Sequence, residues 1–247
     1  MLTRRRILLG LGAAALVPHG AGCTRTRAAR PPWPRTTTHD GVEMIELFPQ
    51  DADESSPLIV AIHGMGDRPD RWVADWREFP ARVHIALPRA FDAYGGGFSW
   101  FRFEDGMTDE EFGAVVGSAE ERLWRGIAKL AGKRRVIVTG FSQGGILSFA
   151  IAARHPAEVV HAFPVAGSCP GPVLPKDKAR AAPLLAFHGT ADRVLDVKWG
   201  REAVNAFKEQ GNVAELREYE GIGHTIAPRM HDDLWDAIKK TLPPATP

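Results

Sequence analysis

Cysteine is scarce in this sequence. Only two of its 247 residues are cysteines, Cys23 and Cys169. If Cys23 is removed or modified, no disulfide can form within the chain, so a hydrophobic core has to stabilise the fold. Neither cysteine is spaced from another cysteine or a histidine in a way that indicates a zinc site. We therefore expect neither a metal nor another cofactor.

An excess of charge is also lacking, since the formal net charge is +1 at pH 7. No basic stripe alternates with aromatic residues, which argues against a nucleic acid as partner. The hydrophobic fraction is 44%. A chain of this length and composition can bury one large core, which fits a single domain better than two.

The first 23 residues contain no acidic residue, and their apolar run, residues 7–17, is too short for a permanent membrane-spanning helix. Three arginines, Arg4 to Arg6, precede that run, and small residues follow it, as in an export signal. The stretch "TRRRILL" resembles a twin-arginine signal, a type by which bacteria export folded proteins. An ordinary secretory signal with three arginines is the alternative.

The end of this segment, "GAGC", resembles the cleavage box of bacterial lipoproteins. Lipidation of Cys23 would attach the protein to a membrane. Gly20 departs from the large aliphatic residue usual at its position, and simple cleavage nearby is the alternative. Either way, we expect an exported bacterial protein that is periplasmic, anchored in the cell envelope or secreted.

The chain divides by composition into three parts. Residues 1–23 form the expected signal, and residues 24–40 are basic, rich in proline and without periodicity, which predicts a flexible linker. Residues 41–247 form the expected domain.

Within that domain, short apolar runs alternate with longer amphipathic ones. The runs predict strands at 42–48, 58–63, 82–88, 134–140, 159–167, 183–189 and 214–221, and helices at 108–132, 144–156, 196–211 and 231–242. This alternation predicts an α/β fold with a mostly parallel sheet and helices on both faces.

One long loop, "RAFDAYGGGFSWFRFEDGM" at 89–107, interrupts the alternation. It follows a predicted strand, and α/β sheets build their sites from loops at the carboxyl ends of strands. Its glycines and aromatics favour contact with substrate, through Gly97, Trp100 and Phe101. The alternative is a loop whose aromatics only cover the core.

The stretch "GFSQG" fits the pattern G-x-S-x-G between a predicted strand and a predicted helix. In that setting the serine sits on a sharp turn, and side chains at the flanking glycines, Gly140 and Gly144, would collide with it. The turn exposes the hydroxyl of Ser142 and directs the backbone N–H of Gln143 toward a carbonyl under attack. The pattern therefore predicts a nucleophile.

A serine nucleophile needs a base and an acid that orients the base, which in this architecture follow in the order Ser, Asp or Glu, His. "FHGTADRV" presents Asp192 after one predicted strand, and "YEGIGHTI" presents His224 after the last one. Nearby alternatives have simpler explanations, since Asp196 can cap a helix and His188 lies within a strand.

A second donor for the oxyanion is expected from the loop after an early strand. "AIHGMGDRP" at 61–69 provides such a loop, and we predict the N–H of Met65 as that donor. His63 is predicted to be a scaffold residue.

Taken together, "HGMGD", "GGGFSWF", "GFSQGG", "HGTADRV" and "GIGHTI" resemble the phospholipase/carboxylesterase family of α/β-hydrolases, which includes the acyl-protein thioesterases. The resemblance covers about residues 57–240. It implies an α/β-hydrolase fold and hydrolysis of a carboxylic ester or thioester through an acyl group on Ser142. His224 would then act first as general base and later as general acid, and Asp192 would hold the His224 ring in one tautomer. Arg102 departs from the acidic residue often found after the aromatic pair.

The expected substrates are small-molecule or lipid esters with short or medium acyl chains, or thioesters, with lysophospholipids among them. One alternative is an extracellular esterase of the feruloyl or polyhydroxyalkanoate type. Another is a non-catalytic binding protein with the same fold, against which the presence of Ser142, Asp192 and His224 together argues.

A histidine base predicts how activity depends on pH. Histidine side chains generally become protonated between about pH 6 and 7, and a protonated His224 could not accept the proton of Ser142. We therefore expect ester hydrolysis to fall below about pH 6 in a pH–rate profile. A profile that stays flat down to about pH 4 would contradict a histidine base.

Overall fold

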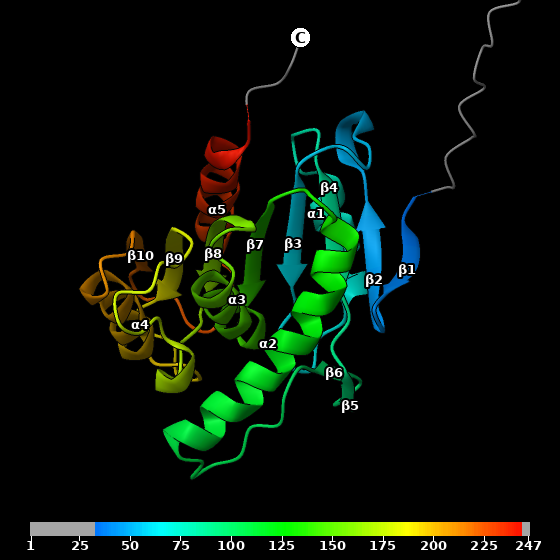
Figure 1. Cartoon of the computed structure of the whole chain (residues 1–247). Helices are drawn as coiled ribbons and strands as arrows, with labels where there is room; N and C mark the ends of the chain where they lie inside the picture. The colour runs from blue at the N-terminus through cyan, green and yellow to red at the C-terminus, as the bar shows by residue number, and fades with distance from the viewer. Residues whose placement is uncertain (1–32, 244–247) are drawn as a thin grey trace, which may run out of the picture. The chain divides into compact units, whose positions relative to one another are not determined.

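A central β-sheet organises residues 33–243, the part of the chain that the computed structural model describes (Figure 1). Its order is β1-β2-β4-β3-β7-β8-β9-β10. The strands are β1 (Arg35–His39), β2 (Val42–Leu47), β3 (Leu58–Ile62), β4 (His84–Pro88), β7 (Val136–Phe141), β8 (Val159–Val165), β9 (Leu184–Gly189) and β10 (Ala214–Tyr219). All neighbours from β4 to β10 are parallel, whereas β2 pairs antiparallel with both β1 and β4.

Helices cover both faces of this sheet and divide the core into two clusters. The helices are α1 (Val73–Arg77), α2 (Asp109–Ala131), α3 (Gln143–Arg154), α4 (Val197–Glu209) and α5 (Pro228–Thr241), with short 3₁₀ turns η1 (Pro49–Asp51), η2 (Pro69–Trp72) and η3 (Gly171–Val173). Buried residues of α2, α3 and α4 pack in one cluster. Those of α1 and α5 pack in the other. The sheet is therefore covered on both sides, as its continuously apolar strands require.

The long helix α2 crosses the near face of the sheet in Figure 1. It begins with a capping box, because Thr108 accepts from the N–H of Glu111 and the Glu111 side chain accepts from that of Thr108. It ends before Gly132, whose φ of +62° suits glycine. Among the helices of residues 33–243, none has the length and apolarity to cross a membrane.

The predicted α/β fold is confirmed, and each predicted strand and helix is present with ends that differ by only a few residues. The prediction missed α1, which is a single short turn. It also missed a small hairpin inside the loop 89–107, formed by β5 (Asp92–Tyr94) and β6 (Gly97–Ser99). The expected signal at residues 1–23, with Cys23, lies outside the described residues.

The linker predicted at 24–40 extends too far toward the domain. Residues 35–39 form β1, which pairs with β2 along its whole length. The two strands meet at Asp40 and Gly41, whose φ values of 47° and 77° belong to a two-residue hairpin turn. The Asp-Gly pair was the signal for this hairpin, and the basic, proline-rich composition before it concealed the strand.

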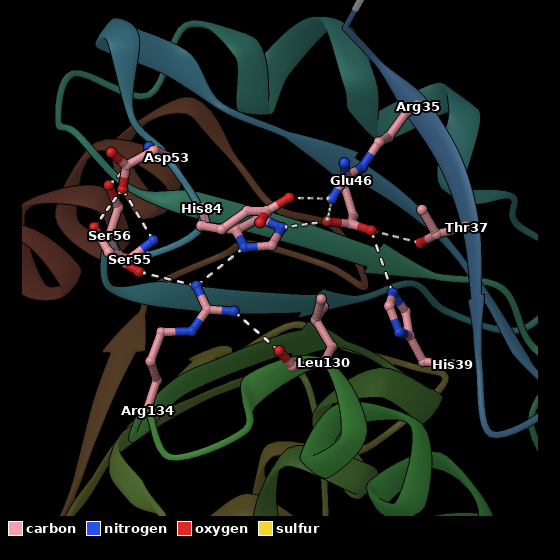
Figure 2. A network of polar contacts seen from close by, with 11 residues as sticks. Arg35, Thr37, His39, Glu46, Asp53, Ser55, Ser56, His84, Leu130 and Arg134 are labelled. Carbon is pink, nitrogen blue, oxygen red and sulfur yellow. Dashed lines mark hydrogen bonds and ion pairs between the residues drawn. The ribbon is translucent and has the colours of Figure 1, made fainter. Parts of the chain in front are cut away.

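A buried carboxylate joins the first strands of the sheet (Figure 2). The Glu46 side chain on β2 is fully buried. Its oxygens lie 2.9 Å from Arg35 Nη2, 2.6 Å from Thr37 Oγ1, 3.3 Å from His39 Nε2 and 2.7 Å from His84 Nε2. Burial alone would raise the pKa of Glu46, but these hydrogen bonds outweigh it and hold the pKa well below its usual range.

The contacts of Arg134 extend this network toward α2 (Figure 2). Its Nη1 lies 3.1 Å from His84 Nδ1 and donates to the carbonyl of Ser56, while Nη2 donates to the carbonyl of Leu130. Because Arg134 can only donate, His84 Nδ1 accepts, and the ring's proton sits on Nε2 facing Glu46. Burial lowers the pKa of His84, which agrees with this neutral tautomer.

Because Glu46 is buried and Glu54 is exposed, the same substitution should destabilise the protein more at Glu46 than at Glu54. Glu46→Gln removes the charge that balances the guanidinium of Arg35, so we expect the free energy of unfolding to fall by about 3 kcal/mol. Glu54 also contacts Arg35, at 3.1 Å, but its side chain is 73% exposed. Glu54→Gln should therefore cost less than about 1 kcal/mol in the same urea titration. Equal losses would contradict a special role for Glu46.

The same network predicts a loss of stability in acid. A group whose pKa is lower in the folded state stabilises the fold above its unfolded pKa, and this contribution is lost as the pH falls. His84 should begin this loss near about pH 6.5, and Glu46 should steepen it below about pH 4.3. Urea titrations at stepped pH should show the steep acid portion in the wild type and a weaker one in Glu46→Gln. Stability that rises on acidification would refute the assignment.

Candidate active site

Ser142 occupies a strained turn between β7 and α3. Its φ is +56°, a conformation that non-glycine residues rarely adopt. The turn is tight because α3 approaches β3 closely: a Cβ on Gly144 would lie 2.0 Å from the carbonyl oxygen of Ile62, and one on Gly140 would lie 2.4 Å from that of Gly144. Both glycines are therefore required by the backbone, as the motif predicts, and the turn presents the serine hydroxyl beyond the strand.

Three side chains from separate loops meet at this turn. His224 Nε2 lies 2.9 Å from Ser142 Oγ, and His224 Nδ1 lies 2.7 Å from Asp192 Oδ2. Asp192 follows β9, and His224 follows β10. The structure thus brings together the three residues that the sequence motifs selected, in the geometry of a nucleophile, its base and the acid that orients the base.

The carboxylate of Asp192 is buried and held by backbone donors. Its Oδ1 accepts from the N–H groups of Val194 and Leu195, both at 2.9 Å. Burial would raise the pKa of Asp192, but the hydrogen bonds from His224 and these two amides lower it overall. The aspartate is therefore fixed as an anion that faces His224 Nδ1.

Two neighbouring residues have structural roles, as their sequence positions indicated. His188 is buried, and its Nε2 lies 2.8 Å from the carbonyl oxygen of Leu195, within the loop that carries Asp192. Asp196 caps α4 by accepting from the N–H of Lys198. Neither competes with Asp192 and His224 for Ser142.

The predicted oxyanion donors flank the serine. Gln143 is the first residue of α3, where no acceptor exists within the helix. Within residues 33–243, neither its N–H nor that of Met65 has a hydrogen-bond acceptor. The Met65 loop also lies against the turn, since a Cβ on Gly64 would be 3.2 Å from Ser142 Cβ. Free backbone donors on the two segments that meet at the serine are suited to stabilise an oxyanion.

The loop 89–107 holds the Met65 loop in place. Gly66 N–H donates to the carbonyl of Phe98, and Phe98 N–H donates to that of Asp67. The indole of Trp100 donates to the carbonyl of His63 at 2.8 Å. The hairpin of this loop thus works as a brace for the residues after β3.

The side chain of Gln143 completes the brace, a role that the sequence did not indicate. Its Oε1 accepts from the N–H of Trp100 and from the hydroxyl of Ser99, and its Nε2 donates to the carbonyl of Phe101. Gln143 therefore ties the loop 89–107 to the first turn of α3. Only the backbone of this residue was predicted to act, because the motif does not specify its side chain.

The expectation that Gly97, Trp100 and Phe101 contact substrate needs correction. The side chains of Trp100 and Phe101 are buried in the core. Gly97 is required by backbone packing, since a Cβ there would lie 2.3 Å from the carbonyl oxygen of Gly66. The aromatic character of the loop reflects core packing and support of the Met65 loop, the alternative that the sequence left open.

His63 is a scaffold residue, as predicted. It is buried, its Nδ1 lies 2.7 Å from the carbonyl oxygen of Gly64, and its Nε2 accepts from the N–H of Ala90. Burial lowers the pKa of His63, which keeps the ring neutral.

A mostly parallel sheet with this turn after a central strand, a serine hydrogen-bonded to a histidine and a histidine hydrogen-bonded to a buried aspartate define the class of α/β-hydrolases. The chain belongs to the phospholipase/carboxylesterase family, whose model matches residues 48–242.

Known proteins similar to this chain have related descriptions. Acyl-protein thioesterase 1 of Gibberella zeae is 24% identical over 80% of this chain and 95% of its own length. A probable inactive carboxylesterase of Oryza sativa subsp. japonica is 27% identical over 69% of this chain and 79% of its own. Among solved structures, esterase PE8 aligns with a TM-score of 0.70 at 25% identity, covering 80% of this chain and 97% of that one.

The contact between the loop 89–107 and the Met65 loop predicts that crowding it will slow ester hydrolysis. In Gly97→Ala the new methyl group would push the Met65 loop away from Ser142, so we expect ester hydrolysis to slow by at least about ten-fold, the scale for a displaced oxyanion donor. Gly95→Ala is the control in the same loop, because no atom lies within 4 Å of the Cβ position of Gly95. The control adds the strain of an alanine at a φ of +54°, which Gly97→Ala lacks, but no collision, and it should remain active in the same kinetic assay.

Proposed function

We propose that the protein hydrolyses carboxylic esters and thioesters through an acyl-serine intermediate. The observation that carries the proposal is the chain of contacts from Ser142 Oγ through His224 to Asp192. Membership of the phospholipase/carboxylesterase family supports it. The substrates proposed are short- or medium-chain esters and thioesters, with lysophospholipids among them.

The proposed reaction runs in two halves. Ser142 Oγ attacks the carbonyl carbon while His224 Nε2 takes its proton, and the oxyanion is held by the N–H groups of Met65 and Gln143. Collapse breaks the bond to the leaving alcohol or thiol, which receives the proton from His224. Water then attacks the acyl carbon, gives its proton to His224 and releases the carboxylic acid as the proton returns to Ser142 Oγ.

A non-catalytic binding protein is the competing function, and a rice relative is described as a probable inactive carboxylesterase. The geometry of this chain favours catalysis. All three side chains are within hydrogen-bond distance in order, and Asp192 is kept anionic by two backbone donors. A protein without catalytic use for these residues would have no reason to maintain a serine at a φ of +56°.

We also propose that the protein acts outside the cytoplasm. The support is the signal-like composition of residues 1–23. Lipidation of Cys23 would add attachment to the membrane of the cell envelope, and cleavage without lipidation would release the enzyme to the periplasm or medium.

Covalent labelling tests the proposed nucleophile. A fluorophosphonate probe should label the wild-type protein at Ser142, and Ser142→Ala should abolish labelling and lower kcat by about 10⁴-fold or more. Ser148→Ala is the matched control, because Ser148 lies on the same helix and donates only to the carbonyl of Gly144. Persistent labelling of Ser142→Ala, or none in the wild type, would contradict catalysis by this residue.

A further inference from the structure

A second histidine, His188 near the end of β9, lies beside the carboxylate of Asp192. Its Nε2 is 3.4 Å from Asp192 Oδ2, the same oxygen that lies 2.7 Å from His224 Nδ1. The side chains of His188 and Asp192 are both buried. A buried carboxylate has to find its hydrogen-bond donors inside the protein, so each neighbouring donor affects where its charge is directed.

The position of the proton on the His188 ring follows from the other neighbour of Nε2. The carbonyl oxygen of Leu195 lies 2.8 Å from His188 Nε2, and a carbonyl can only accept a hydrogen bond. Nε2 therefore carries a proton, which has the Leu195 carbonyl as its main acceptor and Asp192 Oδ2 as a longer and weaker one. The N–H of His188 thus places the positive end of a dipole beside the Asp192 carboxylate.

His188 also completes the set of donors around this carboxylate. A carboxylate offers about four acceptor positions, two on each oxygen. The N–H groups of Val194 and Leu195 occupy Oδ1 of Asp192, each at 2.9 Å. His224 and His188 share Oδ2. Because Leu195 accepts from His188 and donates to Asp192, the ring, the loop and the carboxylate form one closed set of contacts.

The helix α4 leaves space for the His188 ring. A Cβ on Gly200, the fourth residue of α4, would lie 2.7 Å from His188 Nδ1. Glycine within a helix is less favourable than alanine, because it loses more backbone freedom on folding. The ring therefore takes the place that a side chain at residue 200 would need, and the fold gives up helix stability where it admits His188.

Another carboxylate near His188 has a cation of its own. Glu218 of β10 is beside His188 in the parallel register. Arg201 of α4 donates to Glu218 Oε1 at 2.8 Å, and this bond holds the pKa of Glu218 below its usual value. On β8, the residue that bonds to this part of β9 is Ala166, which carries no charge. Asp192 is thus the anion toward which the N–H of His188 is directed.

We propose that His188 is a positioning residue for the reaction, an inference that rests on the proposed hydrolase function. Its N–H anchors the Leu195 carbonyl and occupies part of Asp192 Oδ2, which keeps the carboxylate directed at His224 Nδ1. His188 acts on the reaction only through Asp192. By sharing Oδ2, it also limits how strongly the carboxylate holds the protonated form of His224.

Steady-state hydrolysis of p-nitrophenyl acetate tests the proposal, with the active enzyme counted by fluorophosphonate labelling. His188→Phe keeps an aromatic ring but removes the N–H. We expect its kcat to fall about ten-fold with KM unchanged, and the acid limb of its kcat/KM profile to move up by about 0.5 pH units. His188→Gln, whose side-chain amide can donate from nearly the same place, should restore the wild-type limb and most of kcat.

His161→Phe is the control for replacing a histidine of the sheet. His161 lies on β8, and its Nδ1 is 3.1 Å from the carbonyl oxygen of its own neighbour Ala162. This variant should keep the wild-type kcat and pH profile. A purely structural role of His188 would lower the amount of active enzyme in His188→Phe, but neither kcat for each active site nor the acid limb.

Two results would overturn the proposal: a wild-type kcat and acid limb in His188→Phe, or a His188→Gln protein as impaired as His188→Phe. If His188→Phe does not fold, ¹⁵N NMR of histidine-labelled wild type at about pH 8 decides. Nε2 of His188 must carry the proton, and a ring protonated on Nδ1 alone refutes the contact. Failure of the hydrolase function is distinguishable, since wild type would then neither cleave p-nitrophenyl acetate nor react with the fluorophosphonate, while NMR would still report the proton.

Discussion

The approach of α3 to β3 is the constraint on which the rest of the site depends. Backbone atoms of Gly144 and Ile62 pack so closely that no side chain fits between them. This contact forces the chain to reverse sharply after β7, which leaves Ser142 in a left-handed conformation. Because β3 continues directly into the loop that carries Met65, the same contact sets that loop beside the serine hydroxyl. One packing requirement therefore positions both the proposed nucleophile and its proposed oxyanion donors.

A contact of this kind needs support from outside the turn, since a strained residue persists only where its surroundings over-determine it. The support comes from the loop 89–107, in which Trp100 lies 43 residues before its partner Gln143. Trp100 holds the carbonyl before Gly64, and Gln143 holds the backbone of Trp100. The nucleophile turn, the Met65 loop and the aromatic loop thus form one hydrogen-bonded unit, in which displacement of any part moves the others.

The sequence predicted what depends on short spacings and missed what depends on distant packing. Gly140, Ser142 and Gly144 could be interpreted because the whole pattern spans five residues, although the atom that excludes a side chain at Gly144 is the distant carbonyl oxygen of Ile62. Asp192 and His224 could be interpreted because strand ends of a parallel sheet share an edge. Trp100 was misassigned because an aromatic residue in a loop has the same local pattern whether it faces solvent or the core. The side chain of Gln143 and the partners of Glu46 have no local signature, since their contacts arise only when separate strands and loops assemble.

Polar groups at the two ends of the parallel strands differ in whether they have hydrogen-bond partners within the protein. Near the amino-terminal ends of the parallel strands, Glu46 is surrounded by donors, and its charge is compensated inside the protein. At the carboxyl ends of the strands, the N–H groups of Met65 and Gln143 lack acceptors within residues 33–243. Unused donors are costly in a folded protein unless a ligand satisfies them. The carbonyl oxygen of a substrate attacked by Ser142 would supply the acceptor that these two N–H groups lack, so the fold leaves them free where the proposed reaction needs them.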